Sequence, residues 1–270
     1  MATLDANGQL TLLELAKRRE PDGELAAVAE ILSRSNPVLQ DMPFMEANGK
    51  TYHKSVRRGT LPGGTWRKIN AGVSIESSQT TEVTDAIGML ETYSEVDKAL
   101  AEMSGDIARF RMIEAKAFIE GLSQTLAGAV FYSDSAQDPE QITGLSPRSS
   151  TVDNDFILDG GGTGSDLTSI YIVQWGLDKV HGVYPSGHPQ LGVQRNDLGE
   201  VTLEDAGGKK YQGYRDHYVV KMGLVVRDPR ALGRYANIES SGASNTFDEN
   251  KLIGLLNEMP DDHGNTVIYV

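Results

Sequence analysis

Apolar and polar residues alternate along several stretches of the chain, a pattern that indicates β-strands with one buried face. In the most regular stretch every second residue is apolar: Tyr218, Val220, Met222, Leu224 and Val226. Similar patterns predict strands in SIYIVQWG and KVHGVYP, over residues 79–97, and on either side of the glycines in GEVTLEDAGGKKYQGYRDHYVVKMGLVVRD. The second half of the chain should therefore be rich in strands and turns.

A helical spacing begins near Ser104. Its apolar stripe consists of Ile107, Phe110, Ala117, Leu122, Leu126 and Val130. Ser104 can cap this helix, and Asp106 suits the positive end of its dipole. About 27 residues at 1.5 Å each predict a rod of roughly 40 Å. A second helix is predicted at about 247–258, ended by Pro260.

The first 48 residues contain two short helical patterns. One is spaced by Leu10, Leu13 and Ala16; the other by Leu25, Val28, Ala29 and Leu32, with Asp22 as its cap and Asn36-Pro37 as its end. Neither stripe is wide enough for a core of its own. We therefore expect an arm that packs on another surface.

Residues 51–75 predict two extended runs around a Pro62-Gly63 turn. Neither face of the first run is apolar, and an isolated two-stranded hairpin is only marginally stable in water. We therefore expect a hairpin that projects and is stabilised by something outside its own domain.

Two further segments predict connections. Residues 137–166 are polar and glycine-rich, which indicates a crossing between domains. Residues 266–270, TVIYV, form an apolar strand with no visible partner. We expect the natural chain to continue and to complete a sheet there.

Basic and acidic residues are unevenly distributed along the chain. The 270 residues have a formal net charge of −13, yet residues 49–75 contain no acidic residue. Their basic residues are Lys50, Lys54, Arg57, Arg58, Arg67 and Lys68. The negative net charge of the chain argues against binding of a DNA duplex as its main function. The basic island is either a solvated loop or a surface that docks onto the acidic part of another copy.

Composition limits which kinds of site and which classes of protein the chain can represent. The chain contains no cysteine, which excludes disulfides and thiolate metal sites. No apolar run approaches eighteen residues, and the start lacks the pattern of a secretory signal.

Arg215, Asp216 and His217 resemble a catalytic cluster. Asp216 shares the face of the apolar residues, whereas Arg215 and His217 lie on the opposite face. A base requires its orienting carboxylate within hydrogen-bond reach, so the cluster is a poor triad.

Other motifs carry weaker signals still. DGGGTGSD at 159–166 lacks the GK[ST] ending of a phosphate loop and precedes a strand. DND at 153–155 lacks the spacing of a calcium loop, the five histidines form no HxxxH pair, and no GxSxG occurs. We therefore expect no enzyme, no cofactor and no metal.

The chain resembles the major capsid proteins of tailed bacteriophages, which have the fold first seen in phage Hong Kong 97. The resemblance is especially to the proteins of the short-tailed phages. SIYIVQWGLDKVHGVYP and the segment 191–239, LGVQRND to RYANIE, carry the resemblance, as does the order of the predicted elements. It implies an α+β Hong Kong 97-like capsid fold. It also implies an icosahedral shell that is built from hexamers and pentamers of this chain and encloses the genome.

The resemblance further implies a division of the chain. Its segments are an N-terminal arm (1–48), an extended hairpin loop (49–76), a peripheral domain with a spine helix (77–134), an apical domain (135–262) and the start of a return to the peripheral domain (263–270). The inter-subunit contact candidates are Lys50, Lys54, Arg57, Arg58, Trp66, Arg67 and Lys68. Trp66 is the candidate anchor, with packing on its own hairpin as the alternative.

Several partners are implied as well. No large extension precedes the arm, so we expect a separate scaffolding protein, together with a portal and a cement protein. We expect packaged DNA held without sequence-specific binding, no membrane partner, assembly in the bacterial cytoplasm and a final place in the virion capsid.

Two other classes stay open. One is a carbohydrate-binding β-rich module on a surface or secreted protein, against which the long helix argues. The other is a hydrolase using Asp216 and His217, which the face argument weakens.

Overall fold

The computed structural model describes residues 36–270 except 61, 154, 188–191, 242–243 and 261–264. The predicted helices of the N-terminal arm lie outside the described residues. The described chain divides into two compact units, and two long strands, β3 (Gln79–Asp97) and β8 (Lys210–Val226), run from one unit into the other. The first unit combines residues 89–127 with 192–221.

The first unit places a long helix against strands. Its elements are the second part of β3, α3 (Lys98–Met103), most of α4 (Ile107–Tyr132), β7 (Gln194–Glu204) and the first part of β8. β7 pairs antiparallel with β8, and β3 is a further neighbour of β8 in the sheet. The predicted strand over 79–97 and the predicted long helix are confirmed, the helix with 26 residues.

The cap of α4 differs from the prediction. The Asp106 carboxylate accepts the backbone N–H of Arg109 at 2.9 Å, so Asp106 caps the helix. Ser104 instead donates its hydroxyl to the carbonyl of Ala101 and closes α3. Ser104 was the wrong cap because α3 precedes α4 directly and uses the serine as its own C-cap.

Packing on α4 follows most of the predicted stripe. Phe110 and Leu122 are buried, and Phe118 stacks on Tyr218 of β8 at 5.5 Å between ring centroids. Ala117, however, is exposed in this chain. The stripe therefore faces the sheet over only part of its predicted width.

The second unit contains two groups of strands. Its further elements are α2 (Pro37–Asp41), β1 (Phe44–Glu46), β2 (Tyr52–Thr60), α5 (Leu145–Arg148), β4 (Ile157–Asp159), β5 (Leu167–Gln174), β6 (Val180–Tyr184), η1 (Pro229–Ala231), β9 (Leu232–Glu239), α6 (Glu249–Glu258) and β10 (Thr266–Tyr269). β1 pairs with β6, β6 with the end of β8, and β2 with the start of β3. A separate four-stranded sheet has the order β10-β5-β9-β4.

Helix α6 covers the four-stranded sheet. Leu255 and Met259 pack with Ile172, Tyr235 and other buried residues of β5 and β9. The predicted strands over SIYIVQWG and KVHGVYP are confirmed as β5 and β6, and the predicted helix near 247–258 is confirmed as α6.

Residues 137–166 are not a simple crossing. Ile142, Leu145 and Ser149 are buried in the second unit. A side chain at Gly160 would place its Cβ only 2.5 Å from the carbonyl oxygen of Asn237, which explains a glycine there. The segment is polar overall, but it contributes to the core at a few positions that composition does not reveal.

The strand at 266–270 does have a partner in the chain, because β10 pairs antiparallel with β5. The hydroxyl of Tyr269 accepts a hydrogen bond from Trp175 Nε1 at 2.8 Å and donates one to Asp41 Oδ2 at 2.8 Å. Burial raises the pKa of the Tyr269 hydroxyl, and the Asp41 carboxylate raises it further. The tyrosine therefore joins β10 to Trp175, which follows β5, and to α2.

Replacing Tyr269 with Phe should lower the free energy of unfolding of the second unit by about 1–3 kcal/mol. The change removes both hydrogen bonds and leaves the indole N–H of buried Trp175 without an acceptor. Urea denaturation followed by tryptophan fluorescence measures the loss. A loss equal to that of an exposed control, Tyr132→Phe, would contradict the structural role of this hydroxyl.

Candidate inter-subunit interface

The basic island leads into a long loop between two paired strands. β2 pairs antiparallel with β3 from Tyr52 opposite Ala86 to Thr60 opposite Gln79. Residues 62–78, which we call the β2–β3 loop, have no strand pairing among themselves. The predicted hairpin around Pro62-Gly63 is therefore wrong in its pairing, because the partner of β2 is the start of β3 and not residues 65–75.

The turn at the far end of the loop lies elsewhere too. The backbone N–H of Ala71 donates to the carbonyl of Lys68 at 3.2 Å, and Asn70 has a φ of 64°. Asparagine tolerates this left-handed conformation, which a type II turn requires at its third position. Nearer to β2 and β3, the backbone N–H of Gly64 donates to Glu76 Oε2 at 3.1 Å and joins the two sides of the loop.

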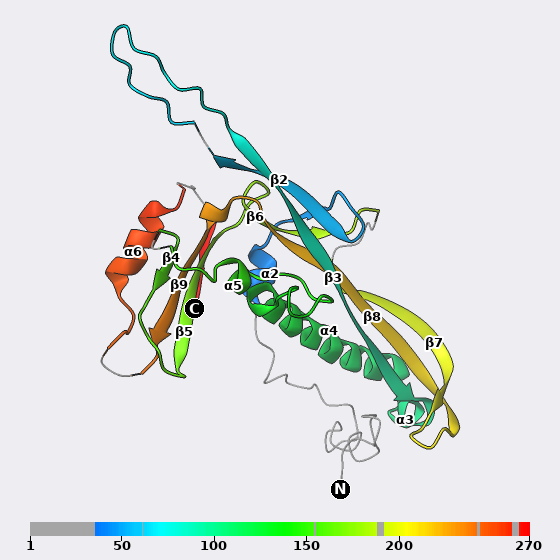
Figure 1. Ribbon diagram of the computed structural model, residues 1–270. Helices are drawn as coiled ribbons and strands as arrows, with labels where there is room; N and C mark the ends of the chain where they lie inside the picture. The colour runs from blue at the N-terminus through cyan, green and yellow to red at the C-terminus, as the bar shows by residue number, and fades with distance from the viewer. Residues whose placement is uncertain (1–35, 61, 154, 188–191, 242–243, 261–264) are drawn as a thin grey trace. The chain divides into compact units, whose positions relative to one another are not determined.

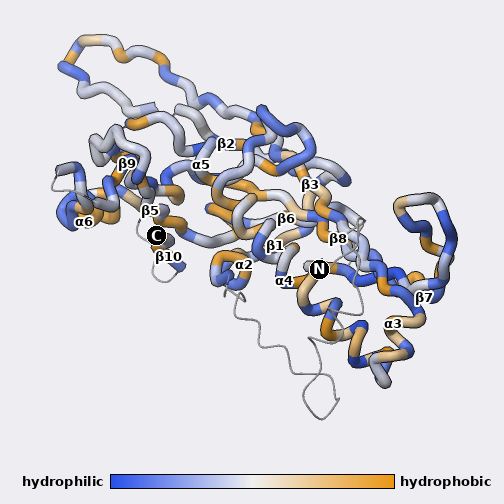
Figure 2. The backbone as a smooth tube through the Cα atoms, turned by 90° about the horizontal axis from the view of Figure 1, so that it is seen from below, coloured by the Kyte–Doolittle hydropathy of each residue, from blue (hydrophilic) through white to orange (hydrophobic). Residues whose placement is uncertain are grey.

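The β2–β3 loop exposes large apolar side chains. Trp66 is 102% exposed, Ile69 is 90% exposed and Ile75 is 99% exposed. Figure 1 shows the loop projecting beyond the ends of β2 and β3, and Figure 2 shows hydrophobic positions on it among polar ones. The alternative that Trp66 packs on its own hairpin is not what the structure shows. Sequence reasoning missed Ile69 and Ile75, although apolar residues in a stretch without alternation were an available signal.

The predicted contact residues fall into two groups. Lys50, Trp66, Arg67 and Lys68 are exposed. Lys54 is exposed but forms an ion pair with Glu82 at 2.6 Å, and the carboxylate raises its pKa. Arg57 is half-buried and donates to the carbonyl of Val226, so its hydrogen bond lies within its own subunit. Arg58 lies in β2, and its side chain is outside the described part of the structure.

The base of the loop rests on a buried polar cluster, although both faces of β2 look polar in the sequence. Arg148 donates to Asp85 at 2.7 Å and to the carbonyl of Leu224 at 2.9 Å. Asp85 is only 3% exposed. Because Arg148 comes from α5, this ion pair connects β3 to α5 and to the end of β8 within the second unit.

Two histidines belong to the same cluster. The rings of His53 and His181 are buried with centroids 6.0 Å apart in an edge-to-face arrangement. Burial lowers the pKa of both imidazoles; Arg227 lowers both further, and His53 also lowers that of His181. Both histidines are therefore held neutral at pH 7.

The face argument for residues 215–217 is confirmed. Asp216 is buried and accepts from Arg111 at 3.0 Å and from Arg195 at 3.1 Å. His217 lies 3.1 Å from Glu91 and stacks on Tyr93 at 4.4 Å between centroids. The carboxylate nearest the histidine belongs to another strand, and the three residues form separate contacts without a shared reacting position.

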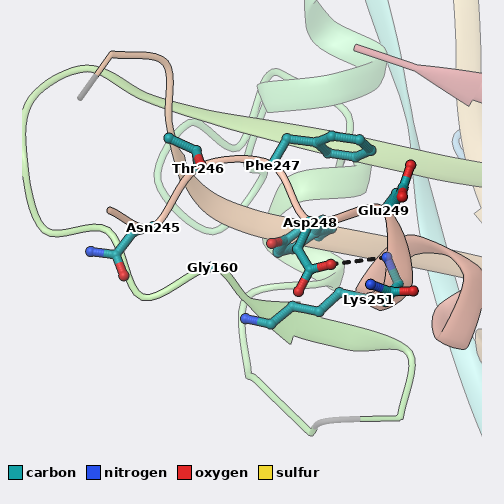
Figure 3. Close-up of a pocket in the computed structure, with 9 residues that line it drawn as sticks. Gly160, Asn245, Thr246, Phe247, Asp248, Glu249 and Lys251 are labelled. Carbon is teal, nitrogen blue, oxygen red and sulfur yellow. Dashed lines mark hydrogen bonds between the residues drawn. The ribbon is translucent and has the colours of Figure 1, made fainter. Parts of the chain in front are cut away.

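The glycine-rich segment 159–166 borders a hollow of about 570 Å³ beside the start of α6. Figure 3 shows Asp248 turned back onto its own helix, where its carboxylate accepts the N–H of Asn250 at 2.9 Å. Lys251 donates to the carbonyl of Asp159 at 3.1 Å, and Tyr235 is buried. β5 follows the glycines, so the helix start that a phosphate loop requires is not there.

Metal-binding clusters and membrane-spanning helices are both absent from the part of the chain that the structure describes. No group of three or more His, Asp or Glu residues there is arranged to hold a metal ion. None of the helices in the same described ranges is both long and apolar enough to span a membrane.

Comparison with known proteins identifies relatives. A family model described as major capsid protein GP7 matches residues 20–270. The solved structure of bacteriophage Epsilon15 matches with a TM-score of 0.72 and 27% identity, over 100% of this chain and 84% of that chain. None of the curated proteins matches the chain.

More distant structures share the fold alone. The capsid of bacteriophage JBD30 matches with a TM-score of 0.54 and 9% identity, over 93% of this chain and 80% of that chain. An encapsulin complex from Synechococcus elongatus PCC 7942 matches with a TM-score of 0.51 and 9% identity, over 87% of this chain and 98% of that chain. The same architecture thus recurs in chains with little sequence in common.

Proposed function

The chain belongs to the major capsid protein GP7 family, and from this membership we propose that its β2–β3 loop is the element that holds neighbouring copies together in the shell. The family match and the Epsilon15 structure confirm the predicted resemblance to capsid proteins of tailed phages, the α+β Hong Kong 97-like fold and the structural role in the capsid shell. The chain is a component of the virion capsid, and its family is structural.

The exposed apolar end of the loop carries the proposal. Burying a side chain such as Ile69 or Ile75 stabilises a protein by about 1.5–3 kcal/mol, and here both side chains lie in solvent. A loop of this length without secondary structure is usually functional. Trp66 lies next to Arg67 and Lys68. An aromatic anchor with basic neighbours suits a partner surface that is apolar at its centre and acidic at its rim.

The structure also supports the stiffness that such a contact requires. Asn48 accepts the backbone N–H of Lys54 at 2.8 Å and donates to its carbonyl at 2.7 Å. The Lys54–Glu82 pair joins β2 to β3, and the buried Arg148–Asp85 pair joins β3 to α5. The ends of the loop are therefore held in place by these contacts. A force on the far end of the loop would be transmitted to the second unit.

Replacing Trp66 with Ala and Arg67 and Lys68 with Glu should reduce the yield of shells at least about tenfold, which corresponds to 1.4 kcal/mol or more of lost contact. These three side chains are exposed and contribute little to the core, so the unassembled chain should stay folded. Arg57 is left unchanged because it bonds to Val226. Sedimentation and electron microscopy of the chain co-expressed with its neighbouring phage proteins measure the yield.

A matched control tests whether charge alone matters. Lys209→Glu with Lys210→Glu makes the same charge change at two exposed lysines, the last residue before β8 and the first residue of β8. Lys210 lies 3.5 Å from Glu204, an exposed ion pair that contributes little to stability. This control should assemble like the unchanged chain. Normal shells from the loop variant would remove the loop from the contact, whatever the control does.

Further partners extend this function. Copies of the chain would form hexamers and pentamers, and a separate scaffolding protein, a portal and a cement protein would complete the particle. The shell would be assembled in the bacterial cytoplasm. The net charge of −13 supports a shell that encloses DNA without binding its sequence. The division into arm, extended loop, peripheral domain and apical domain also stays a proposal.

A further inference from the structure

An asparagine–glycine pair, Asn48-Gly49, lies just before β2. The side chain of Asn48 donates from Nδ2 to the carbonyl of Lys54 at 2.7 Å and accepts the backbone N–H of Lys54 at 2.8 Å. The carbonyl of Gly49 accepts the N–H of Ser186, which follows β6, at 3.2 Å. A single exposed amide therefore holds the start of β2, and we call its two hydrogen bonds the Asn48 clamp.

The same pair of residues is chemically reactive. Asparagine is a thermolabile residue, and a following glycine leaves its own backbone nitrogen open to attack Cγ of the asparagine. The new N–Cγ bond closes a five-membered imide, the Cγ–Nδ2 bond breaks, and ammonia leaves with the proton of the glycine N–H. Water then opens the imide at one of its two carbonyls, which yields either aspartate or isoaspartate. The reaction consumes no reagent other than water.

The fold does not allow a less reactive residue at position 49. A Cβ added to Gly49 would lie 2.8 Å from the carbonyl oxygen of Tyr52, a backbone atom at the start of β2. A side chain here would hinder imide formation, but it would also displace the strand. The chain therefore keeps a reactive pair at the position where the Asn48 clamp acts.

The clamp opposes this reaction. Imide closure brings Cγ of Asn48 onto the nitrogen of Gly49, whereas the clamp holds the same amide against Lys54. Breaking two hydrogen bonds of ordinary strength should slow closure about 5- to 150-fold relative to the unfolded chain. We propose that Asn48 is a modification site that the clamp controls: the asparagine deamidates when the clamp opens, and the product loosens the start of β2.

The products lack what the clamp uses. An ionised aspartate has no donor, so at position 48 it would place a carboxylate oxygen against the carbonyl of Lys54, where Nδ2 now donates. Isoaspartate adds one carbon to the main chain in the short connection between β1 and β2. Either change should loosen the strand from which the β2–β3 loop extends. Only the consequence for assembly rests on the proposed function of that loop; the modification itself does not.

Mass spectrometry of proteolytic peptides measures the conversion at Asn48 in the folded chain and in urea, at the same mildly alkaline pH. Asn7-Gly8 is an internal control, because it also follows an alanine and should react as fast as Asn48 in urea. Asn48 should react at least about fivefold more slowly in the folded chain. Equal rates in the folded chain and in urea would overturn the role of the clamp. A stable Asn48 in urea, where Asn7 reacts, would overturn the site.

Asn48→Asp reproduces one product without the reaction. Backbone amides of β2 should exchange hydrogen at least about fivefold faster in this variant of the unassembled chain, because the lost bond favours local opening. The matched control is Asn70→Asp, the same change at an exposed asparagine of the β2–β3 loop, which should leave exchange in β2 unchanged. Equal exchange in the two variants would overturn the proposed effect of the product.

Shell yield separates this inference from the proposed function. The Asn48→Asp chain should assemble less well than the unchanged chain. If it assembles normally while the variant of Trp66, Arg67 and Lys68 fails, the function of the loop stands and the consequence of deamidation for assembly falls. If both variants assemble, the proposed function of the loop falls, and the measured conversion of Asn48 decides the modification site by itself.

Discussion

Replacing Asp85 with Ala should lower the free energy of unfolding of the second unit by about 3–5 kcal/mol, because it breaks a buried ion pair from one side. Asp85 accepts from Arg148 at 2.7 Å, and the Arg148 side chain is only 14% exposed. Without the carboxylate, Arg148 would lose its ion-pair partner, and half-buried Arg57 would lose one of the two carboxylates, Asp85 and Asp228, that offset the repulsion from Arg148. Tryptophan fluorescence of buried Trp175 during urea denaturation reports this unit.

The matched control is Glu82→Ala on the same strand. Glu82 pairs with Lys54 at 2.6 Å, but both side chains are about half exposed, so this change should cost less than about 1 kcal/mol. A similar loss in both variants would show that the cluster below the loop has no special energetic role. The Asp85 variant should also assemble poorly, because the loop depends on this base.

Acidification from pH 7.5 to 5.5 should destabilise the second unit by up to about 2–3 kcal/mol, owing to His53 and His181. Burial lowers the pKa of both imidazoles in the folded chain, so they bind protons more readily when the chain unfolds. The stability contribution is therefore complete above the unfolded pKa near 6.5 and is lost as the pH falls below it. Above about pH 5 the exposed carboxylates still carry most of their charge.

The charged groups around the pair explain why it cannot readily accept protons. Burial is the largest cause that lowers the pKa of both imidazoles, Arg227 after β8 lowers both further, and Asp85 from β3 raises both. The double variant His53→Gln, His181→Gln should show a flatter dependence of unfolding free energy on pH over this range, compared with its own value at pH 7.5. An unchanged chain equally stable at pH 5.5 and 7.5 would contradict the assignment.

Local patterns were sufficient for much of the structure. The alternation over 79–97, 169–174 and 218–226 and the spacing of α4 and α6 predicted elements that the structure contains, because each pattern buries one face whatever its neighbour is. Alternation also separated Asp216 from His217, since neighbouring strand residues face opposite sides. The capsid family was recognisable because its segments occur in the expected order along the chain.

Pairing and burial of polar groups were decided by the tertiary structure. The sequence predicted a turn at Pro62-Gly63, but β2 pairs with β3, where buried His53 lies opposite buried Asp85. The partner of β10 is β5, about a hundred residues earlier in the chain, which no local pattern can show. His53 and Ser55 look like solvated residues in the sequence, yet they are buried.

The same division applies to the interface. By itself the sequence determined the basic island and Trp66, because charge and residue type are properties of single positions. Only the tertiary structure decided that Trp66, Ile69 and Ile75 lie in solvent and that Arg57 bonds within its own subunit. The physical reason is that the exposure of a side chain depends on which distant segments approach it, and the hydrophobic effect, being non-directional, does not select those segments from a local pattern.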